Sequence, residues 1–219
     1  GAYNLLEACR LHMDSVHRVI IASSDKAYGE PANLPCSEEA PLQGRHPYAV
    51  SKSCADLIAQ AYHHTYGLPV AIARCGNVYG GGDLNWSRIV PGTIRRLVRG
   101  ERPVIWGDGS DLRDYIYVKD VVRAYLCLAE QLGAERVRGQ AFNLSAEKPM
   151  TALEMVAIIR TLMDCAHLAP DYCGSAEAEI RNQHLSAQKA RTFLNWKPAY
   201  DLKAGLRETI DWYREFLSR

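Results

Sequence analysis

The apolar residues of this chain form short continuous runs that alternate with longer amphipathic stretches. Residues 18–22 and 69–74 are apolar runs of the kind that makes buried parallel strands. Residues 48–66 between them have the spacing of an amphipathic helix, with Pro47 suited to its first turn and Gly67 to its end. Strand, helix and strand in this order imply a right-handed crossover. The pattern therefore predicts an α/β fold built on a doubly wound parallel sheet.

The rest of the chain continues this alternation. Its pattern predicts helices over residues 87–99, 120–132 and 202–217, and a strand over residues 141–145. The sequence Thr-Ala-Leu-Glu at 151–154 has the form of a capping box and should open another helix. Residues 30–46 are rich in Pro, Ser, Glu and Gly, which indicates a loop over the candidate site described below.

Composition and charge restrict the class of protein. The 219 residues include 26 basic and 25 acidic side chains, so the net charge is +1 and nothing recommends a nucleic-acid partner. No apolar run approaches the length of a membrane span. The seven cysteines are scattered, with no C-x-x-C pair and no cysteine–histidine cluster at zinc spacing. We therefore expect reduced thiols, a cytoplasmic protein and no metal site.

Two short motifs carry candidate chemistry. Residues 23–29, Ser-Ser-Asp-Lys-Ala-Tyr-Gly, directly follow the first predicted strand, at the sheet edge where ligands bind in open α/β sheets. Tyr48 and Lys52 are four residues apart and share one face of the next helix. A positive charge beside a tyrosine favours the phenolate, which is a proton acceptor suited to alcohol oxidation. Either motif alone is common by chance, whereas the two together in this order are much rarer.

On these motifs the chain resembles the extended short-chain dehydrogenase/reductase family, which contains the nucleotide-sugar epimerases and dehydratases. The resemblance runs from residue 1 to the C terminus, and includes Arg-Asp-Tyr-Ile-Tyr-Val at 113–118 and a Leu-Asn-Trp-Lys-Pro segment at 194–198. Asn195 replaces the usual glycine there, and asparagine tolerates a left-handed turn. The resemblance implies the C-terminal part of a Rossmann-type doubly wound parallel sheet with an interleaved smaller α/β substrate domain. The NAD-binding domain would take residues 1–74 and 120–144, and the nucleotide-sugar domain residues 75–119 and 145–219.

The same resemblance implies that part of the family fold lies outside this sequence. Residues 1–10 are similar to the helix that precedes the catalytic strand in the family. The Gly-x-x-Gly-x-x-Gly turn that cradles the NAD pyrophosphate is not in the sequence, and the glycine clusters at 80–82 and 107–109 lack its spacing. We interpret the chain as a piece of a longer NAD-dependent enzyme and expect the piece alone to bind NAD poorly.

The resemblance assigns roles to individual residues. Tyr48 would accept the proton, Lys52 would hold the nicotinamide ribose, and Ser24 would hydrogen-bond the reacting oxygen. Asp25 and Lys26 would carry out an elimination. The binding assignments are Ser23, Tyr48 and Lys52 for NAD, and Asn77, Arg113, Asn143 and Arg181 for the nucleotide sugar.

Some of these assignments have simpler alternatives. The Asp-Lys pair at 25–26 also fits a solvated turn. Arg113 also fits a salt bridge with Asp108 or Asp111. Trp106 either stacks on the nucleotide base or fills a core.

The residues after the two serines indicate the reaction. In the family, 4,6-dehydratases carry an acid followed by Glu or Lys there, as in Asp25-Lys26, whereas simple 4-epimerases carry small or apolar residues. The Gly-Gly-Gly-Asp segment at 80–83 is similar to the CDP-glucose 4,6-dehydratase branch in particular. We predict an NAD-dependent nucleotide-sugar 4,6-dehydratase that prefers CDP-glucose; a 4-epimerase and a non-catalytic fragment are the alternatives. The family also implies a homodimer through helices 2–10 and 48–66.

Overall fold

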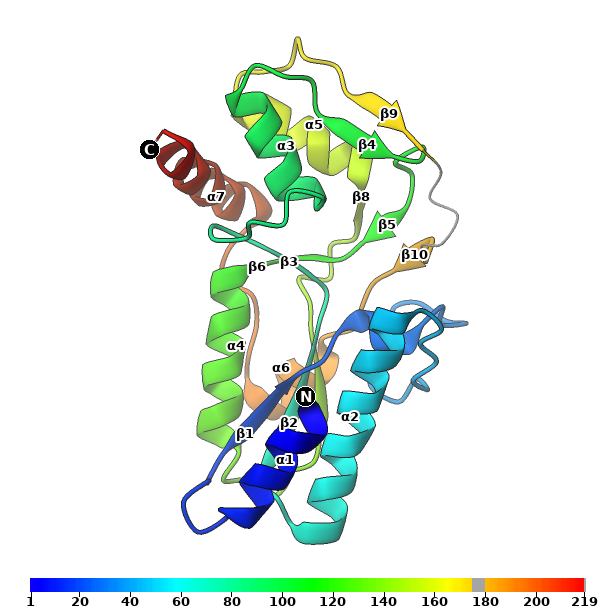
Figure 1. Cartoon of the computed structure of the whole chain (residues 1–219), viewed down its shortest axis with the longest axis vertical. Coiled ribbons are helices and arrows are strands. Elements are labelled where there is room, and N and C mark those ends of the chain that lie inside the picture. Colours follow the sequence, from blue (N-terminus) through cyan, green and yellow to red (C-terminus); the bar gives the residue numbers. More distant parts are fainter. Residues whose placement is uncertain (175–179, 219) are drawn as a thin grey trace.

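A parallel sheet with helices on both faces forms one half of the molecule, and a group of helices and short strands forms the other (Figure 1). This computed structural model describes residues 1–174 and 180–218. The helices are α1 (Ala2–Leu11), the 3₁₀ helix η1 (Asp25–Tyr28), α2 (Pro47–Tyr66), α3 (Ile89–Val98), α4 (Val118–Gln131), α5 (Ala152–Leu162), α6 (Gln188–Leu194) and α7 (Leu202–Leu217). The strands are β1 (Val19–Ala22), β2 (Val70–Cys75), β3 (Asn77–Tyr79), β4 (Val104–Trp106), β5 (Leu112–Arg113), β6 (Tyr115–Tyr117), β7 (Ala141–Leu144), β8 (Met150–Thr151), β9 (Asp171–Cys173) and β10 (Asn182–Gln183).

The main sheet has the order β1-β2-β7, and its strands are all parallel. Every residue of the central strand β2 is buried, which explains its continuous apolar run. Val70 and Ile72 pack against α1 and α2, whereas Ala71 and Ala73 pack against α4 and α6. This alternation is the period of two of a β-strand. Helices therefore cover both faces, which confirms the doubly wound α/β fold.

A buried ion pair attaches α2 to the sheet. Asp56 on α2 and Arg74 on β2 are 0% and 3% exposed. Arg74 Nε donates to Asp56 Oδ2 at 2.8 Å, and Nη2 donates to Oδ1 at 2.9 Å. α2 ends at Gly67 with a left-handed φ of 70°, as its sequence predicts. The position and rotation of α2, which carries the Tyr-Lys motif, are thus set by a charge pair inside the core.

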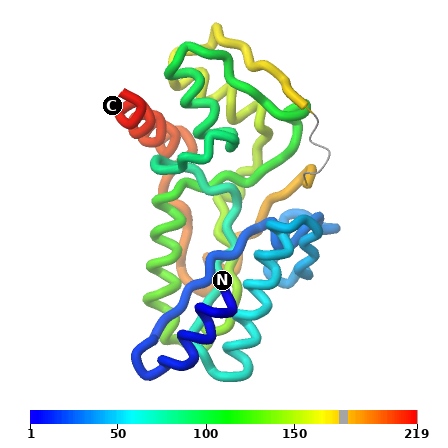
Figure 2. Tube along the Cα trace, viewed as in Figure 1, coloured from blue at the N-terminus to red at the C-terminus, as the bar shows by residue number. Residues whose placement is uncertain are grey.

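The second half of the molecule has a core of its own. Helices α3, α5 and α7 pack there against the parallel pair β3–β6. The capping box at the start of α5 is present, and α7 has the predicted bounds. The chain passes between the halves through α4, which returns to the sheet (Figure 2). α6 also packs against the sheet, although it falls in the range 145–219 that was predicted to form the second domain.

The outer surfaces of α1 and α2 carry apolar side chains. The exposed large ones are Tyr3, Leu5, Leu11, Tyr48, Val50, Leu57 and Tyr66. The two helices lie against each other, with Tyr62 Oη donating to Glu7 Oε2 at 2.9 Å. Of the helices in the described ranges, none has the length and apolarity that crossing a bilayer would require.

Candidate active site

Polar side chains follow each of the three parallel strands at one edge of the sheet. Ser23 follows β1, the half-buried Asn77 follows β2, and Ser145 follows β7. The N-terminal part of α2 lies at the same edge, because Ser53 Oγ donates to Ala27 O at 2.9 Å and η1 packs against α2 (Figure 1). Ligands bind at this edge in open α/β sheets. The turn after β1 and the Tyr-Lys helix are therefore adjacent.

The Tyr48–Lys52 pair lies at the start of α2. Lys52 Nζ donates to Ala22 O, at the end of β1, at 2.8 Å. The same nitrogen lies 5.7 Å from the centre of the Tyr48 ring. Tyr48 is 56% exposed, so its hydroxyl is accessible to a substrate. A cation held beside an accessible phenol is the arrangement that a tyrosine proton acceptor needs.

The two serines of the turn have different surroundings. Ser24 caps η1, because its Oγ accepts from Lys26 N at 3.2 Å and donates to Asp25 Oδ1 at 3.0 Å. Ser23 Oγ is buried and has no hydrogen-bond partner among the described residues. An unpaired buried hydroxyl is unfavourable unless something else bonds to it. Ser23 is therefore suited to contact a bound ligand.

Asp25 and Lys26 form a largely buried pair. Asp25 is 1% exposed, so it does not belong to a solvated turn. Its Oδ2 lies 3.5 Å from Lys26 Nζ and has no hydrogen-bond partner among the described residues. Lys26 Nζ donates instead to Gln183 Oε1. One buried carboxylate oxygen of Asp25 thus makes no hydrogen bond with the described residues.

Asn143 lies beneath the turn, inside a buried polar network. Its Oδ1 accepts from Tyr28 Oη at 2.7 Å, and its Nδ2 donates to Cys36 O at 2.9 Å. Arg74 Nη1 donates to the same Tyr28 oxygen at 2.8 Å. Asn143 N donates to Glu38 Oε1 at 2.7 Å, and burial raises the pKa of the Glu38 carboxyl. In this structure, groups of the protein therefore satisfy the hydrogen bonds of the Asn143 amide, and its bond to Tyr28 holds the end of η1.

Of the two arginines predicted to bind phosphate, Arg113 lies on β5 and Arg181 directly precedes the neighbouring strand β10. β5 and β10 pair in parallel, with Arg113 opposite Gln183. Arg113 Nη1 donates to Arg181 O at 3.0 Å, and Nη2 contacts Asp111 Oδ2 at 3.2 Å. The Arg181 side chain is exposed. Trp106, at the end of β4, is 63% exposed, which excludes the core alternative for that residue.

Asp114 is a buried residue that the sequence motifs did not single out. Its Oδ2 accepts from Ser145 Oγ and from Leu185 N, the latter at 3.1 Å. Burial raises the pKa of its carboxyl to about 6. The only signal in the sequence was its position beside Arg113 in the Arg-Asp-Tyr segment. Asp114 joins β6, β7 and the segment that follows β10.

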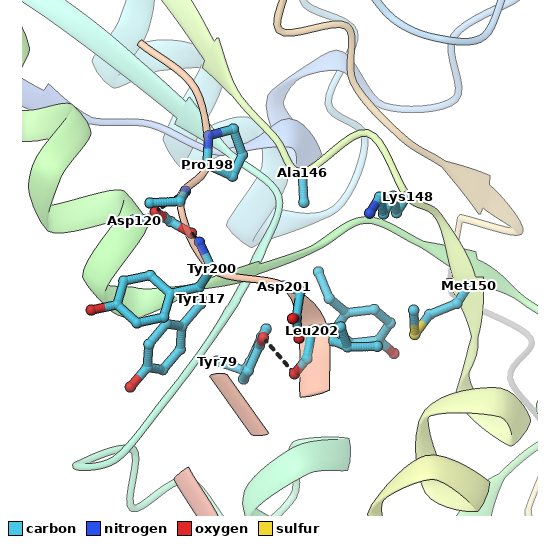
Figure 3. A pocket seen from close by; sticks show the side chains of 12 residues that line it. Tyr79, Tyr117, Asp120, Ala146, Lys148, Met150, Pro198, Tyr200, Asp201 and Leu202 are labelled. Atoms are coloured by element: carbon cyan, nitrogen blue, oxygen red, sulfur yellow. Dashed lines mark hydrogen bonds between the residues drawn. The ribbon is translucent and has the colours of Figure 1, made fainter. Parts of the chain in front are cut away.

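A separate pocket of about 320 Å³ lies between α4, α7 and the β3–β6 pair (Figure 3). Tyr79, Tyr117, Tyr200 and Lys148 are among its lining residues. Tyr79 Oη donates to Leu202 O at 3.4 Å across its wall (Figure 3). All the site residues predicted from the sequence are described, and none of them lines this pocket. We therefore place the candidate active site at the sheet edge.

Comparison with known proteins identifies the family. Residues 1–145 match the NAD dependent epimerase/dehydratase family. A putative UDP-glucose 4-epimerase of Methanocaldococcus jannaschii is 31% identical to the chain, over 98% of the chain and 68% of that protein. The chain belongs to the NAD-dependent epimerase/dehydratase family.

Similar members of the NAD-dependent epimerase/dehydratase family include both reaction types. A dTDP-glucose 4,6-dehydratase of Xanthomonas campestris pv. campestris is 30% identical over 97% of this chain and 64% of its own length. The crystal structure of a Bacillus anthracis dTDP-glucose 4,6-dehydratase in complex with NAD has a TM-score of 0.88 at 29% identity, covering 98% of this chain and 66% of that one. A Thermotoga maritima UDP-glucose 4-epimerase with UDP-glucose has a TM-score of 0.89 at 28% identity, with coverages of 99% and 69%. The chain thus spans about two thirds of the length of these relatives.

The family uses NAD, and the residues at the sheet edge fit part of that cofactor. The buried Ser23 Oγ lacks a partner among the described residues, and Lys52 Nζ is fixed nearby by Ala22 O. A hydroxyl and an ammonium group at this edge suit the hydroxyls of a ribose. Ser23 and Lys52 are therefore the residues that would hold the nicotinamide end of NAD.

Proposed function

We propose that the protein is an NAD-dependent nucleotide-sugar 4,6-dehydratase. The observation that carries the proposal is the buried Asp25, whose Oδ2 has no hydrogen-bond partner in the described part of the chain. A 4-epimerase needs a proton acceptor and a hydride acceptor, whereas a dehydratase also needs an acid for a departing hydroxyl. Asp25 lies on η1, which packs against the helix that carries the Tyr-Lys pair, and its Oδ2 makes no hydrogen bond with the described residues, so it suits that acid. The similar proteins include UDP-glucose 4-epimerases as well as dTDP-glucose 4,6-dehydratases, so the choice between the two reactions rests on Asp25.

In the first step the substrate is oxidised at C4. The C4 hydroxyl proton passes to Tyr48 Oη, while Ser24 Oγ hydrogen-bonds the reacting oxygen. NAD⁺, when bound, supplies the acceptor for the C4 hydride. Lys52, held by Ala22 O, keeps a positive charge beside the tyrosine that receives the proton.

The second step removes water across C5 and C6. Once C4 is a ketone, the C5 hydrogen is acidic because the resulting anion delocalises onto the carbonyl. Asp25 Oδ2 gives its proton to the C6 hydroxyl, the C6–O bond breaks, and water leaves. The amine of Lys26 in its neutral form, or a water molecule bound beside it, takes the C5 proton. Return of the hydride to C6 and of a proton to C5 completes the 4-keto-6-deoxy sugar.

The nucleotide part of the substrate would extend from this turn toward β5 and β4. Arg113 and Arg181 would bind the diphosphate, since a guanidinium can donate two parallel bonds to phosphate oxygens. The exposed Trp106 would stack on the base, and Asn77 would contact the sugar or diphosphate. The CDP-glucose preference stays a prediction from the sequence, because the relatives named above carry dTDP-glucose and UDP-glucose in their names.

We also propose that a second copy of the protein covers α1 and α2. Their outer faces carry Tyr3, Leu5, Val50, Leu57 and Tyr66, all at least 41% exposed. Several exposed apolar side chains on two neighbouring helices are typical of an interaction surface. A cytoplasmic location stays a prediction.

The test is the reaction of the full-length protein with NAD⁺ and, separately, CDP-, dTDP- and UDP-glucose in deuterated water. We expect a 4-keto-6-deoxy product with deuterium at C5 from one of them. Asp25→Asn should block the elimination but spare the oxidation at C4. Formation of the C4 epimer, with no keto sugar, would refute the dehydratase and favour the epimerase. No turnover of any nucleotide sugar would favour a non-catalytic role.

A further inference from the structure

The fully buried side chain of Gln183 touches the candidate catalytic turn at three places. Its Nε2 donates to Asp25 O at 2.6 Å and lies 3.5 Å from Gly29 O. Its Oε1 accepts from Lys26 Nζ. One amide therefore holds both ends of η1 and the lysine between them.

The backbone of the turn is constrained from another side as well. Gly29 ends η1 with a φ of +67°, and a Cβ at this position would lie 2.3 Å from Gln43 O. The close approach of the 43–44 backbone therefore fixes where the turn ends. With that end fixed, the Gln183 amide determines how the Asp25 peptide and the Lys26 side chain are oriented.

The contact with Gln183 also affects how the two charges pair. Lys26 Nζ bonds to the neutral Gln183 oxygen and stays 3.5 Å from Asp25 Oδ2. The ammonium group therefore has a close partner that is not the carboxylate. Asp25 Oδ2 remains without a hydrogen bond among the described residues.

We infer that Gln183 is a positioning residue for the elimination step: it holds Lys26 beside Asp25 while leaving Asp25 Oδ2 available to the C6 hydroxyl. The inference rests on the proposed dehydratase function. Gln183 also lies opposite Arg113 in the β5–β10 pair. The same residue therefore contacts the turn that carries Asp25 and pairs with the strand that carries the arginine proposed to bind the diphosphate. Because this pairing is made by the backbone, a change of the Gln183 side chain leaves it in place.

The first test is Gln183→Met in the full-length protein with NAD⁺. Methionine has a similar volume but neither donates to Asp25 O nor accepts well from Lys26. Loss of a buried hydrogen bond to a charged group predicts a roughly ten- to hundredfold slower elimination, measured as deuterium exchange at C5 and as keto-sugar formation. KM should stay within about twofold, and the absorbance of enzyme-bound NADH should increase, because oxidation continues while elimination lags. The exposed neighbour on the same strand provides the control, and Asn182→Ala should behave as the wild type.

A double-mutant cycle separates positioning from a general structural effect. If Gln183 acts through Lys26, then Gln183→Met should slow C5 exchange by less than about threefold in a Lys26→Met background. If the two substitutions slow C5 exchange independently, so that their effects multiply, the inference is overturned. Equal losses of oxidation and elimination in Gln183→Met would also overturn it.

The remaining outcomes are also decisive. If Gln183→Met does not fold, Gln183→Asn provides a second variant, because its amide is one methylene too short to reach the turn. Loss of folding in both variants would assign Gln183 a purely structural role and overturn the inference. Wild-type dehydration rates in Gln183→Met would overturn the inference while leaving the proposed function intact. A wild-type protein that only epimerises C4 would overturn both the inference and the proposed dehydratase function.

Discussion

Replacing Asp56 by leucine should destabilise the protein strongly, because it leaves a buried guanidinium without its counter-charge. Asp56 and Arg74 are 0% and 3% exposed, and two hydrogen bonds of 2.8 and 2.9 Å join them. Leucine has the branched shape of aspartate with larger terminal groups, so no cavity forms and the main loss comes from the unpaired charge. Removing one partner of a buried pair costs about 3–5 kcal/mol. We expect a loss of that size in the free energy of unfolding of Asp56→Leu.

The double variant Asp56→Leu/Arg74→Met tests this explanation, because it removes the unpaired charge as well. Arg74 also donates to Tyr28 Oη and Glu38 O, Gln60 Nε2 donates to Asp56 Oδ1, and each lost bond costs about 1 kcal/mol. We therefore expect the double variant to lose about 3 kcal/mol and to be more stable than the single variant, which also keeps the unpaired charge.

The measurement is urea unfolding followed by circular dichroism, with the midpoint and slope compared between variants. Asp211→Asn is the control, since it alters an exposed pair 3.9 Å apart and should hardly move the midpoint. The reasoning would be refuted by a double variant that is no more stable than Asp56→Leu. It would also be refuted if Asp56→Leu lost less than about 1 kcal/mol of its free energy of unfolding.

Three further predictions concern the site. Tyr48→Phe should lower the turnover number of the full-length enzyme by about 10² to 10⁴ without moving its unfolding midpoint; near wild-type turnover would exclude Tyr48 as the proton acceptor. Arg113→Ala should raise KM for the nucleotide sugar roughly ten- to a hundredfold, and an unchanged KM with a collapsed turnover number would contradict a binding role. Burial raises the pKa of Asp114 from 3.8 to about 6, so the folded protein favours the protonated form of this carboxyl. The stability that the protonated Asp114 contributes is fully present below pH 3.8 and is lost as the pH rises through about 6. The wild type should therefore lose roughly 3 kcal/mol relative to Asp114→Asn between about pH 3.5 and about pH 6.5 in urea unfolding; a stability difference that does not change with pH would contradict this.

Local signals in the sequence were enough to predict most of the elements. The apolar runs became β1 and β2, and α2 lies within one residue of its predicted range. Asn195 adopts a left-handed φ of 53° at the end of α6, as an asparagine in the place of glycine suggested. Periodicity, caps and turn residues act over a few positions, so they can be recognised without knowledge of the fold. The family resemblance carried by the two motifs also assigned Ser23, Ser24, Tyr48 and Lys52 to one site.

The tertiary structure decided what each polar side chain contacts. Trp106 is exposed, and Asn143 is surrounded by protein groups, but no local pattern distinguishes these positions. The packing of α6 against the sheet likewise depends on a surface formed by β7 and α4. Gln183 and Lys26 are 157 residues apart in the sequence, and Asp56 and Arg74 lie on different elements. Such contacts form only when the packing of helices and strands brings distant segments together, so they follow from the fold as a whole.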